Sequence, residues 1–176
     1  MISEQIVKCQ KCKLCKVIPF ELTPVPPLIG NKSKVMLVTD NPRLEELMIS
    51  EPISVVEQEF LKKHIDINKL YITNLVKCNP IKVKNGKVND RPPLKSEIEI
   101  CKSWLYSEID ILKPSTIIGC GTKINELFLK TDEISYYQPV NIQGIDFIPS
   151  YSIKYLLNRS SKEIDRFVKM LKGVLC

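Results

Sequence analysis

The chain reads Leu70-Tyr-Ile-Thr-Asn-Leu-Val-Lys-Cys78 near its middle, and this stretch decides the predicted fold. Its apolar and β-branched residues predict a buried strand over residues 70–76, with a cysteine two positions beyond the strand end. Similar short apolar runs at residues 35–39, 116–120 and 146–149 predict three more strands.

Helical segments lie between these runs. Residues 54–65, 96–113 and 160–175 carry apolar side chains at helical spacing, and each segment begins with a Ser-x-x-Glu capping box. A further helix is predicted after Gly121, ending near Lys130. Strands that alternate with helices favour an α/β fold, here a three-layer sandwich with a short parallel four-stranded sheet. Ligands of such sheets bind at the carboxyl ends of the strands.

Composition limits the class of protein. With 176 residues and a hydrophobic fraction of 44%, the chain is expected to fold as a single domain over residues 1–176. No apolar run approaches the roughly 20 residues that span a bilayer, and the N-terminus lacks the pattern of a signal peptide. We therefore expect no membrane partner and a cytoplasmic location. A net charge of +6 is compatible with a nucleic-acid partner but does not establish one.

Seven cysteines without a secretory signal favour metal or thiol chemistry over disulfides. Cys9 and Cys12 form a Cys-x-x-Cys pair, which is a common spacing for metal ligands. Cys78 follows the strand quoted above, and Cys101 lies in the first turns of the next predicted helix. Two distant parts of the chain are therefore expected to meet at one iron–sulfur or zinc site.

The first 34 residues are expected to form the cluster-binding segment. Residues 3–16 are predicted to be a short helix that carries the cysteine pair, and the proline-rich residues 17–34 an extended connection. A metal site would tie this segment to the sheet, since cross-links that close long loops give the largest gain in stability.

These motifs resemble those of the family 4 (iron–sulfur) uracil-DNA glycosylases. The resemblance covers nearly the whole chain, and the Tyr-Ile-Thr-Asn-x-Val-Lys-Cys part is its most specific element. It implies a uracil-DNA-glycosylase-like fold, DNA as partner and a [4Fe–4S] cluster. Besides residues 70–78 it rests on Cys9-Gln-Lys-Cys-Lys-Leu-Cys15, Arg91-Pro-Pro-Leu-Lys-Ser-Glu-Ile-Glu-Ile-Cys101, Lys113-Pro-Ser-Thr-Ile-Ile-Gly-Cys-Gly121 and Tyr155-Leu-Leu-Asn-Arg159.

The resemblance also implies which cysteines hold the cluster. The ligands would be Cys9, Cys12, Cys78 and Cys101, in a cluster that is structural rather than redox-active. A zinc ion at the same four residues is the alternative. The remaining cysteines, expected to be packing residues, are Cys15, Cys120 and Cys176.

The family's base pocket is kept only in part. Asn74 matches the asparagine that reads the edge of uracil, because an amide offers both a donor and an acceptor; the alternative is a residue that caps a strand end. The family's Gly-Glu-x-Pro-Gly motif reads Thr39-Asp-Asn-Pro-Arg43 here. Asp40 and Asn41 are thus the candidates for holding the catalytic water, and the alternative is an ordinary strand-to-turn junction.

Two further pocket positions depart from the family. Ile53, after Pro52, stands where the family has the phenylalanine that stacks on uracil, and Ser152 stands where it has the catalytic histidine. His64 is expected to be a solvated helix residue instead. Loss of one preorganised donor typically costs about 10²–10³ in rate, and base–aromatic stacking is worth roughly 1–3 kcal/mol. Weak, altered or absent glycosylase activity is therefore expected, and whether the protein is an enzyme stays open.

The C-terminal motif suggests a contact with DNA. It resembles the family loop that inserts an apolar wedge into the duplex, which makes Leu156 and Leu157 wedge candidates and Arg159 a phosphate contact. The alternative is an apolar connection between a strand and a helix.

An insertion relative to the family, around residues 82–88, suggests a second contact. Asn85-Gly86 predicts the tip of a hairpin, whose Lys84 and Lys87 would form a basic finger on DNA. An ordinary solvated hairpin is an equal alternative.

We expect a divergent uracil-DNA-glycosylase-like iron–sulfur protein that binds DNA and acts in repair or replication as an accessory factor, with a protein partner there. One alternative is an active DNA glycosylase, on uracil or another base, in base excision repair. The other is a protein-interaction module that retains only the fold. A steep fall of DNA affinity with salt would distinguish the first two from the third.

Overall fold

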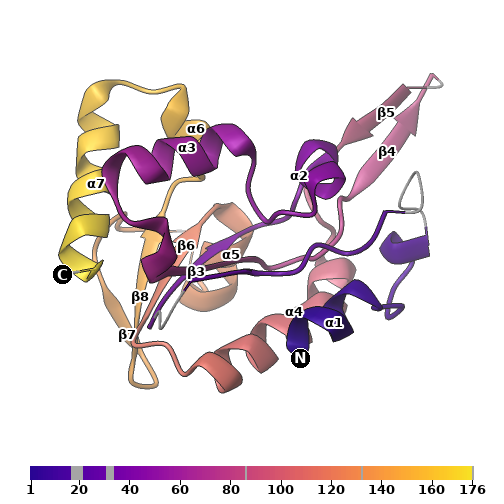
Figure 1. Cartoon of the computed structure of the whole chain (residues 1–176), viewed down its shortest axis with the longest axis horizontal. Helices are drawn as coiled ribbons and strands as arrows, with labels where there is room; N and C mark the ends of the chain where they lie inside the picture. The colour runs from indigo at the N-terminus through magenta and orange to yellow at the C-terminus, as the bar shows by residue number, and fades with distance from the viewer. Residues whose placement is uncertain (17–21, 31–33, 86, 132, 176) are drawn as a thin grey trace.

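The computed structural model describes residues 1–16, 22–30, 34–85, 87–131 and 133–175 (Figure 1). The main sheet has the strand order β1-β3-β2-β6-β8-β7. β3, β2, β6 and β8 run parallel to one another, whereas β1 and β7 pair antiparallel at the two edges. Their bounds are β1 Leu28–Ile29, β2 Val35–Thr39, β3 Leu70–Asn74, β6 Thr116–Cys120, β7 Val140–Ile142 and β8 Ile145–Ser150.

The four parallel strands are those that the sequence predicts, and the α/β fold class is confirmed. The sheet also has two edge strands, β1 and β7, that the sequence analysis did not predict. β1 and β7 are two and three residues long, and all their side chains are partly or fully exposed, so neither is long enough to form a buried apolar run. β1 falls within the predicted proline-rich connection, of which residues 17–21 and 31–33 lie outside the described residues.

Helices cover both faces of the sheet, as the three-layer prediction requires. Met36 packs on one face in a cluster with Leu105 of α4. Leu37, its neighbour in β2, points to the other face and packs with Leu61 of α3 and Phe167 of α7. This alternation follows from the two-residue period of a strand. Among the described residues the α-helices are α1 Ile2–Val7, α2 Leu44–Ile49, α3 Val55–His64, α4 Lys95–Leu112, α5 Thr122–Leu129, α6 Ile153–Leu157 and α7 Ser161–Leu175.

The predicted helix over residues 3–16 is wrong in extent. α1 ends at Val7, and a separate 3-10 turn spans Leu14–Lys16. The intervening chain contacts α4 instead of continuing the helix. Lys11 Nζ lies 4.0 Å from the ring centroid of Trp104, whose Nε1 donates to Sγ of Cys9 at 3.2 Å.

The capping boxes also differ from prediction. At α3 the predicted box is confirmed, since Ser54 Oγ accepts from the backbone N–H of Glu57. At α4 the box predicted at Ser96 is wrong, because the helix is capped at Leu94 and the carboxylate of Glu97 accepts the Leu94 N–H at 2.7 Å. Glu97 is held there by Arg91, whose Nη1 donates to it at 2.8 Å.

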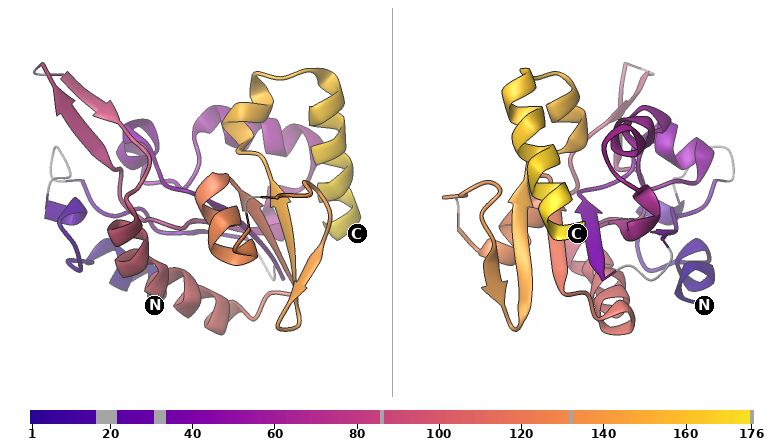
Figure 2. Two further views of the ribbon diagram at one scale, coloured as in Figure 1. Left: turned by 180° about the vertical axis from the view of Figure 1, so that it is seen from behind. Right: turned by 60° about the vertical axis from the view of Figure 1, so that its left-hand side comes forward.

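The insertion forms the predicted hairpin, with β4 (Ile81–Lys84) antiparallel to β5 (Lys87–Asp90). Asn85 at its tip has a φ of 53°, the left-handed conformation that such a turn needs. The hairpin projects from the body of the molecule (Figure 2). None of the helices in the described part of the chain is both long and apolar enough to cross a membrane.

Candidate active site

A polar pocket of about 170 Å³ opens at the carboxyl ends of β2 and β6. Its wall also includes the segment that leads into α3 and the start of α6. Four of the five pocket candidates line it, namely Asp40, Asn41, Ile53 and Ser152. The fold therefore joins segments that are far apart in the sequence at the edge where parallel sheets bind ligands.

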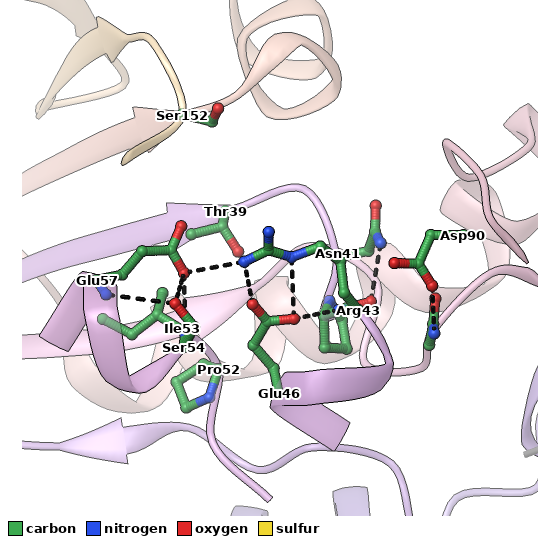
Figure 3. A network of polar contacts seen from close by, with 12 residues as sticks. Thr39, Asn41, Arg43, Glu46, Pro52, Ile53, Ser54, Glu57, Asp90 and Ser152 are labelled. Atoms are coloured by element: carbon green, nitrogen blue, oxygen red, sulfur yellow. Dashed lines mark hydrogen bonds and ion pairs between the residues drawn. The ribbon is translucent and has the colours of Figure 1, made fainter. Parts of the chain in front are cut away.

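Arg43 forms the centre of a buried ion-pair network in this wall (Figure 3). Its Nε and Nη2 pair with the two oxygens of Glu46, and Nη2 also lies 3.3 Å from Oε2 of Glu57. Glu46 is 2% exposed and Glu57 7%. Burial acts to lower the pKa of Arg43, but hydrogen bonding to Glu46 and the two carboxylate charges outweigh it and raise the pKa, which keeps the guanidinium charged.

Two helix N-termini hold the carboxylates in place. Oε2 of Glu57 accepts from both the backbone N–H and the hydroxyl of Ser54, each at 2.9 Å, at the start of α3. Glu46 lies in the first turn of α2 and accepts the backbone N–H of Arg43 at 2.6 Å. Negative side chains are stabilised at these positions by the exposed N–H groups of a helix start.

The third guanidinium nitrogen of Arg43, Nη1, makes none of the contacts drawn and points toward the side of the pocket where Ser152 lies (Figure 3). A fixed N–H donor of this kind can bind a keto oxygen of a base or a developing anion. The network nevertheless contains one guanidinium and two carboxylates, so its net charge is negative. That charge opposes negative charge on a ligand.

Asp40 follows β2 and combines burial with close contacts. Its Oδ1 accepts the backbone N–H of Ile124 at 2.9 Å. A Cβ at Gly121 would lie 2.6 Å from the Asp40 carboxylate, so only glycine permits this approach. Burial raises the pKa of Asp40, although the N–H groups of Ile124 and Lys123 act in the opposite direction. A carboxylate in this setting is suited to act as a general base on water.

Asn41 and Ser152 make local contacts. Nδ2 of Asn41 donates to the carbonyl of Pro42 at 2.9 Å, and Oγ of Ser152 accepts the backbone N–H of Tyr155 at 3.3 Å as the N-cap of α6. Ile53 is 1% exposed and gives the pocket an aliphatic rather than an aromatic wall.

Asn74 lies behind the pocket wall. Its Nδ2 donates to Oγ1 of Thr39 at 2.5 Å and to the carbonyl of Pro52 at 2.8 Å, and the side chain is fully buried. Oδ1 has no hydrogen-bond partner among the described residues. The donor half of the amide thus holds the wall together, while the acceptor half is unused.

The segment predicted to wedge into DNA is the short helix α6. Leu156 is fully buried in the core and Leu157 packs against the same cluster, whereas Tyr155 and Arg159 are exposed. In this conformation Leu156 anchors α6 to the sheet, and the surface of the segment is aromatic and basic. Lys84 and Lys87 are exposed on the projecting hairpin.

The four candidate ligand cysteines gather beside α4. Cys78 and Cys101 are buried in one part of the hydrophobic core, and Cys12 packs against that part. Burial is the main cause that raises the pKa of the Cys78 thiol. The charges of the neighbouring thiolates act in the same direction, namely those of Cys101, Cys12, Cys15 and Cys9. Burial raises the pKa of Cys101 to about 11. Within the described residues, no three His, Cys, Asp or Glu side chains are arranged to hold a single metal ion.

A buried ion pair lies between the pocket and the cysteines. Nζ of Lys77 lies 2.6 Å from Oε2 of Glu108 and 2.6 Å from Oγ1 of Thr73, and the two charged side chains are 1% and 0% exposed. The backbone N–H of Lys77 donates to Sγ of Cys101 at 3.3 Å. Lys77 therefore fixes the chain between Asn74 and Cys78.

A three-layer α/β sandwich with a polar pocket at the carboxyl ends of its parallel strands belongs to the class of proteins that bind a small ligand or a nucleotide at that edge. The comparison with known families is more specific. The chain belongs to the Uracil DNA glycosylase superfamily, whose family model matches residues 26–174.

Several relatives carry the name type-4 uracil-DNA glycosylase. The Saccharolobus solfataricus protein is 32% identical over 127 residues, which cover 69% of this chain and 54% of that protein. The Sulfurisphaera tokodaii protein is 27% identical, and the match covers 89% of this chain and 69% of that protein. The Thermotoga maritima protein is 26% identical, and the match covers 96% of this chain and 88% of that protein. The chain thus spans just over half of the first of these relatives and most of the third.

Sequence reasoning placed Arg43 in the pocket motif without assigning it a role, and it missed Glu46 and Glu57 as pocket residues. Glu57 was visible only as a capping residue, and Arg43 and Glu46 are spaced as an ordinary i, i+3 pair on a helix. Neither pattern indicates that α2 and α3 point their first turns at the same cavity.

Proposed function

We propose that this protein binds DNA and excises a base from it slowly, as a divergent iron–sulfur glycosylase that serves DNA repair or replication. The observation that carries the proposal is the pocket itself, which gathers Asp40, Asn41 and Ser152 at the carboxyl ends of the parallel strands and is walled by the Arg43 network. The family membership supports DNA as the substrate, and the exposed Arg159, Lys84 and Lys87 are available for phosphates.

Excision of a base needs a water that attacks the sugar carbon and donors that stabilise the departing base anion. Asp40 is placed to take a proton from that water. Arg43 Nη1 would donate to the keto oxygen of the base, in the role that the family gives to a histidine. Ile53 and Ser152 are the other two wall positions around the bound base.

Two features support a low rate. Glu46 and Glu57 together outweigh the positive charge of Arg43 just where the base anion would form. Ile53 supplies no aromatic face, and base–aromatic stacking contributes roughly 1–3 kcal/mol. Ser152 also replaces the histidine donor that the resemblance implies. We therefore expect excision to be about 10²-fold or more slower than in relatives that keep the histidine.

The cysteine site fits the cluster that the resemblance implies. Cys9, Cys12, Cys78 and Cys101 would hold [4Fe–4S], and the N–H groups that donate to Cys9 and Cys101 would stabilise thiolate sulfur. A cubane is ligated at four separate irons, so its cysteines stand farther apart than the ligands of one zinc ion. A bound cluster supplies the positive charge that buried thiolates need, and ties the N-terminus to α4.

The experiment is single-turnover excision, with protein in excess over uracil-containing single- and double-stranded DNA. The matched variants are Asp40→Asn, which preserves size, and Arg43→Lys, which keeps a positive charge beside Glu46 and Glu57 but removes the guanidinium donors. Slow excision by the parent that both variants abolish supports the proposal. No excision with retained DNA binding supports a binding-only accessory factor. Absence of both excision and DNA binding would contradict the proposal and favour a protein-interaction module.

A further inference from the structure

A row of stacked aromatic rings runs along the surface beside the pocket. Tyr136 and Tyr151 stack with ring centroids 3.8 Å apart and planes inclined by 23°. Tyr151 and Tyr155 stack at 4.9 Å and 25°. The guanidinium carbon of Arg159 then lies 4.2 Å from the centroid of Tyr155. The row therefore contains three rings and ends in a guanidinium plane.

We call this row, which consists of Tyr136, Tyr151, Tyr155 and Arg159, the tyrosine stack. Its outer end is open to solvent. Tyr155 is 40% exposed and Arg159 is exposed. Within the described residues no carboxylate pairs with Arg159, and the three tyrosine hydroxyls have no hydrogen-bond partner. Stacking on Tyr155 therefore holds the Arg159 guanidinium, and the tyrosine rings are held by contacts with one another and with Tyr137.

The tyrosine stack adjoins the candidate active site. Tyr136, Tyr151 and Tyr155 line a second cavity, of about 270 Å³, whose wall also contains Asp40 and Ser152. The same two residues belong to the wall of the first pocket. A ligand that extends from the first pocket past Ser152 would meet the rings next.

We propose that the tyrosine stack binds an unpaired nucleobase, that of the nucleotide next to the one held in the pocket. The inference rests on the proposed function, because it requires a DNA strand in the pocket. Aromatic faces and arginine planes both stack on bases without regard to sequence. A base would continue the stack on the outer face of Arg159, or replace Arg159 on Tyr155 and release it to a phosphate.

This proposal favours strands in which neighbouring bases are unpaired. A duplex would have to unstack two adjacent nucleotides, which adds a cost of a few kcal/mol for the second base. Single-stranded DNA has no pairing to lose. The structure therefore points to single-stranded or locally opened DNA as the preferred substrate class.

The test uses a single-stranded oligonucleotide with 2-aminopurine, whose fluorescence is quenched by stacking, on either side of a uracil. Fluorescence and binding are measured for the parent protein and for Tyr155→Ala, Tyr155→Phe and Tyr106→Ala. Tyr106 is a matched control, since it is 43% exposed on α4, outside both cavities. Circular dichroism confirms that each variant folds.

We expect quenching at one flanking position with the parent protein. Tyr155→Ala should lose that quenching and bind about 5- to 150-fold more weakly, whereas Tyr155→Phe and Tyr106→Ala should behave like the parent. Binding and quenching that persist in Tyr155→Ala would overturn the stacking site while leaving the proposed function intact. A parent protein that binds no DNA at moderate salt would overturn both.

Discussion

Replacing Lys77 by methionine should strongly destabilise this protein. Lys77 and Glu108 form an ion pair that is 1% and 0% exposed. Methionine keeps the volume of the lysine stem but removes the ammonium group. The Glu108 carboxylate would then stay buried with only the hydroxyls of Thr73 and Tyr71, at 2.9 and 3.3 Å, as donors.

The expected magnitude follows from this geometry. Removing one partner of a fully buried pair leaves an uncompensated charge and costs about 3–5 kcal/mol. For a chain of this size, that corresponds to a fall of roughly 6–20 °C in the midpoint of thermal unfolding. The double variant Lys77→Met/Glu108→Leu should cost much less than the sum of the two single variants, because neither charge remains buried.

The assay is thermal unfolding followed by circular dichroism at one scan rate, with Lys62→Met as control. Lys62 pairs with Glu59 at 2.9 Å, but these side chains are 48% and 65% exposed, so its loss should cost at most about 1 kcal/mol. If Lys77→Met shifted the midpoint no more than Lys62→Met, the claim that burial makes this pair a structural requirement would be refuted.

The site leads to three further predictions. Cys78→Ala should lose bound iron and brown colour, measured by absorption and metal analysis, whereas Cys120→Ala, buried on the other face of the sheet, should keep them; colour retained in Cys78→Ala would contradict the ligand assignment. Asp40→Asn should raise the unfolding midpoint at neutral pH, because an ionised carboxylate with a raised pKa destabilises the folded state above that pKa. The gain should shrink as the pH falls through the folded-state pKa, and a gain independent of pH would refute this reading. Lys84→Ala/Lys87→Ala should weaken DNA binding and reduce the slope of log K against log salt by about 0.9 for each phosphate that the hairpin no longer neutralises; an unchanged slope would mean that the hairpin does not touch DNA.

Much of the fold was predictable because its central strands are buried. A strand such as 35–39 must be apolar on both faces, and that requirement leaves a run that can be read from the sequence. β1 and β7 were not predictable, since an edge strand needs hydrogen bonds on one side only and tolerates exposed side chains. α2 and α6, of six and five residues, were missed because they are too short to establish a helical period.

The candidate site was predictable only by position. Asp40, Asn41 and Ser152 could be placed at strand ends, and the sequence supports their meeting at one edge of the sheet. The direction in which a side chain points from a turn or a short helix depends on what packs behind it. For that reason the sequence did not show that Leu156 is buried in the core, or that Asn74 donates to the Pro52 carbonyl from behind the pocket wall.

Local sequence was sufficient for the α/β fold class, for the order of the four parallel strands along the chain and for the resemblance to a family with which the comparisons agree. These properties depend on local apolar patterns and on motifs of adjacent residues. Long-range packing places Arg43 in the pocket between Glu46 and Glu57, and it stacks Tyr136 on Tyr151 beside the pocket. Such contacts join residues through space, and their energies arise from burial and alignment that no local pattern records.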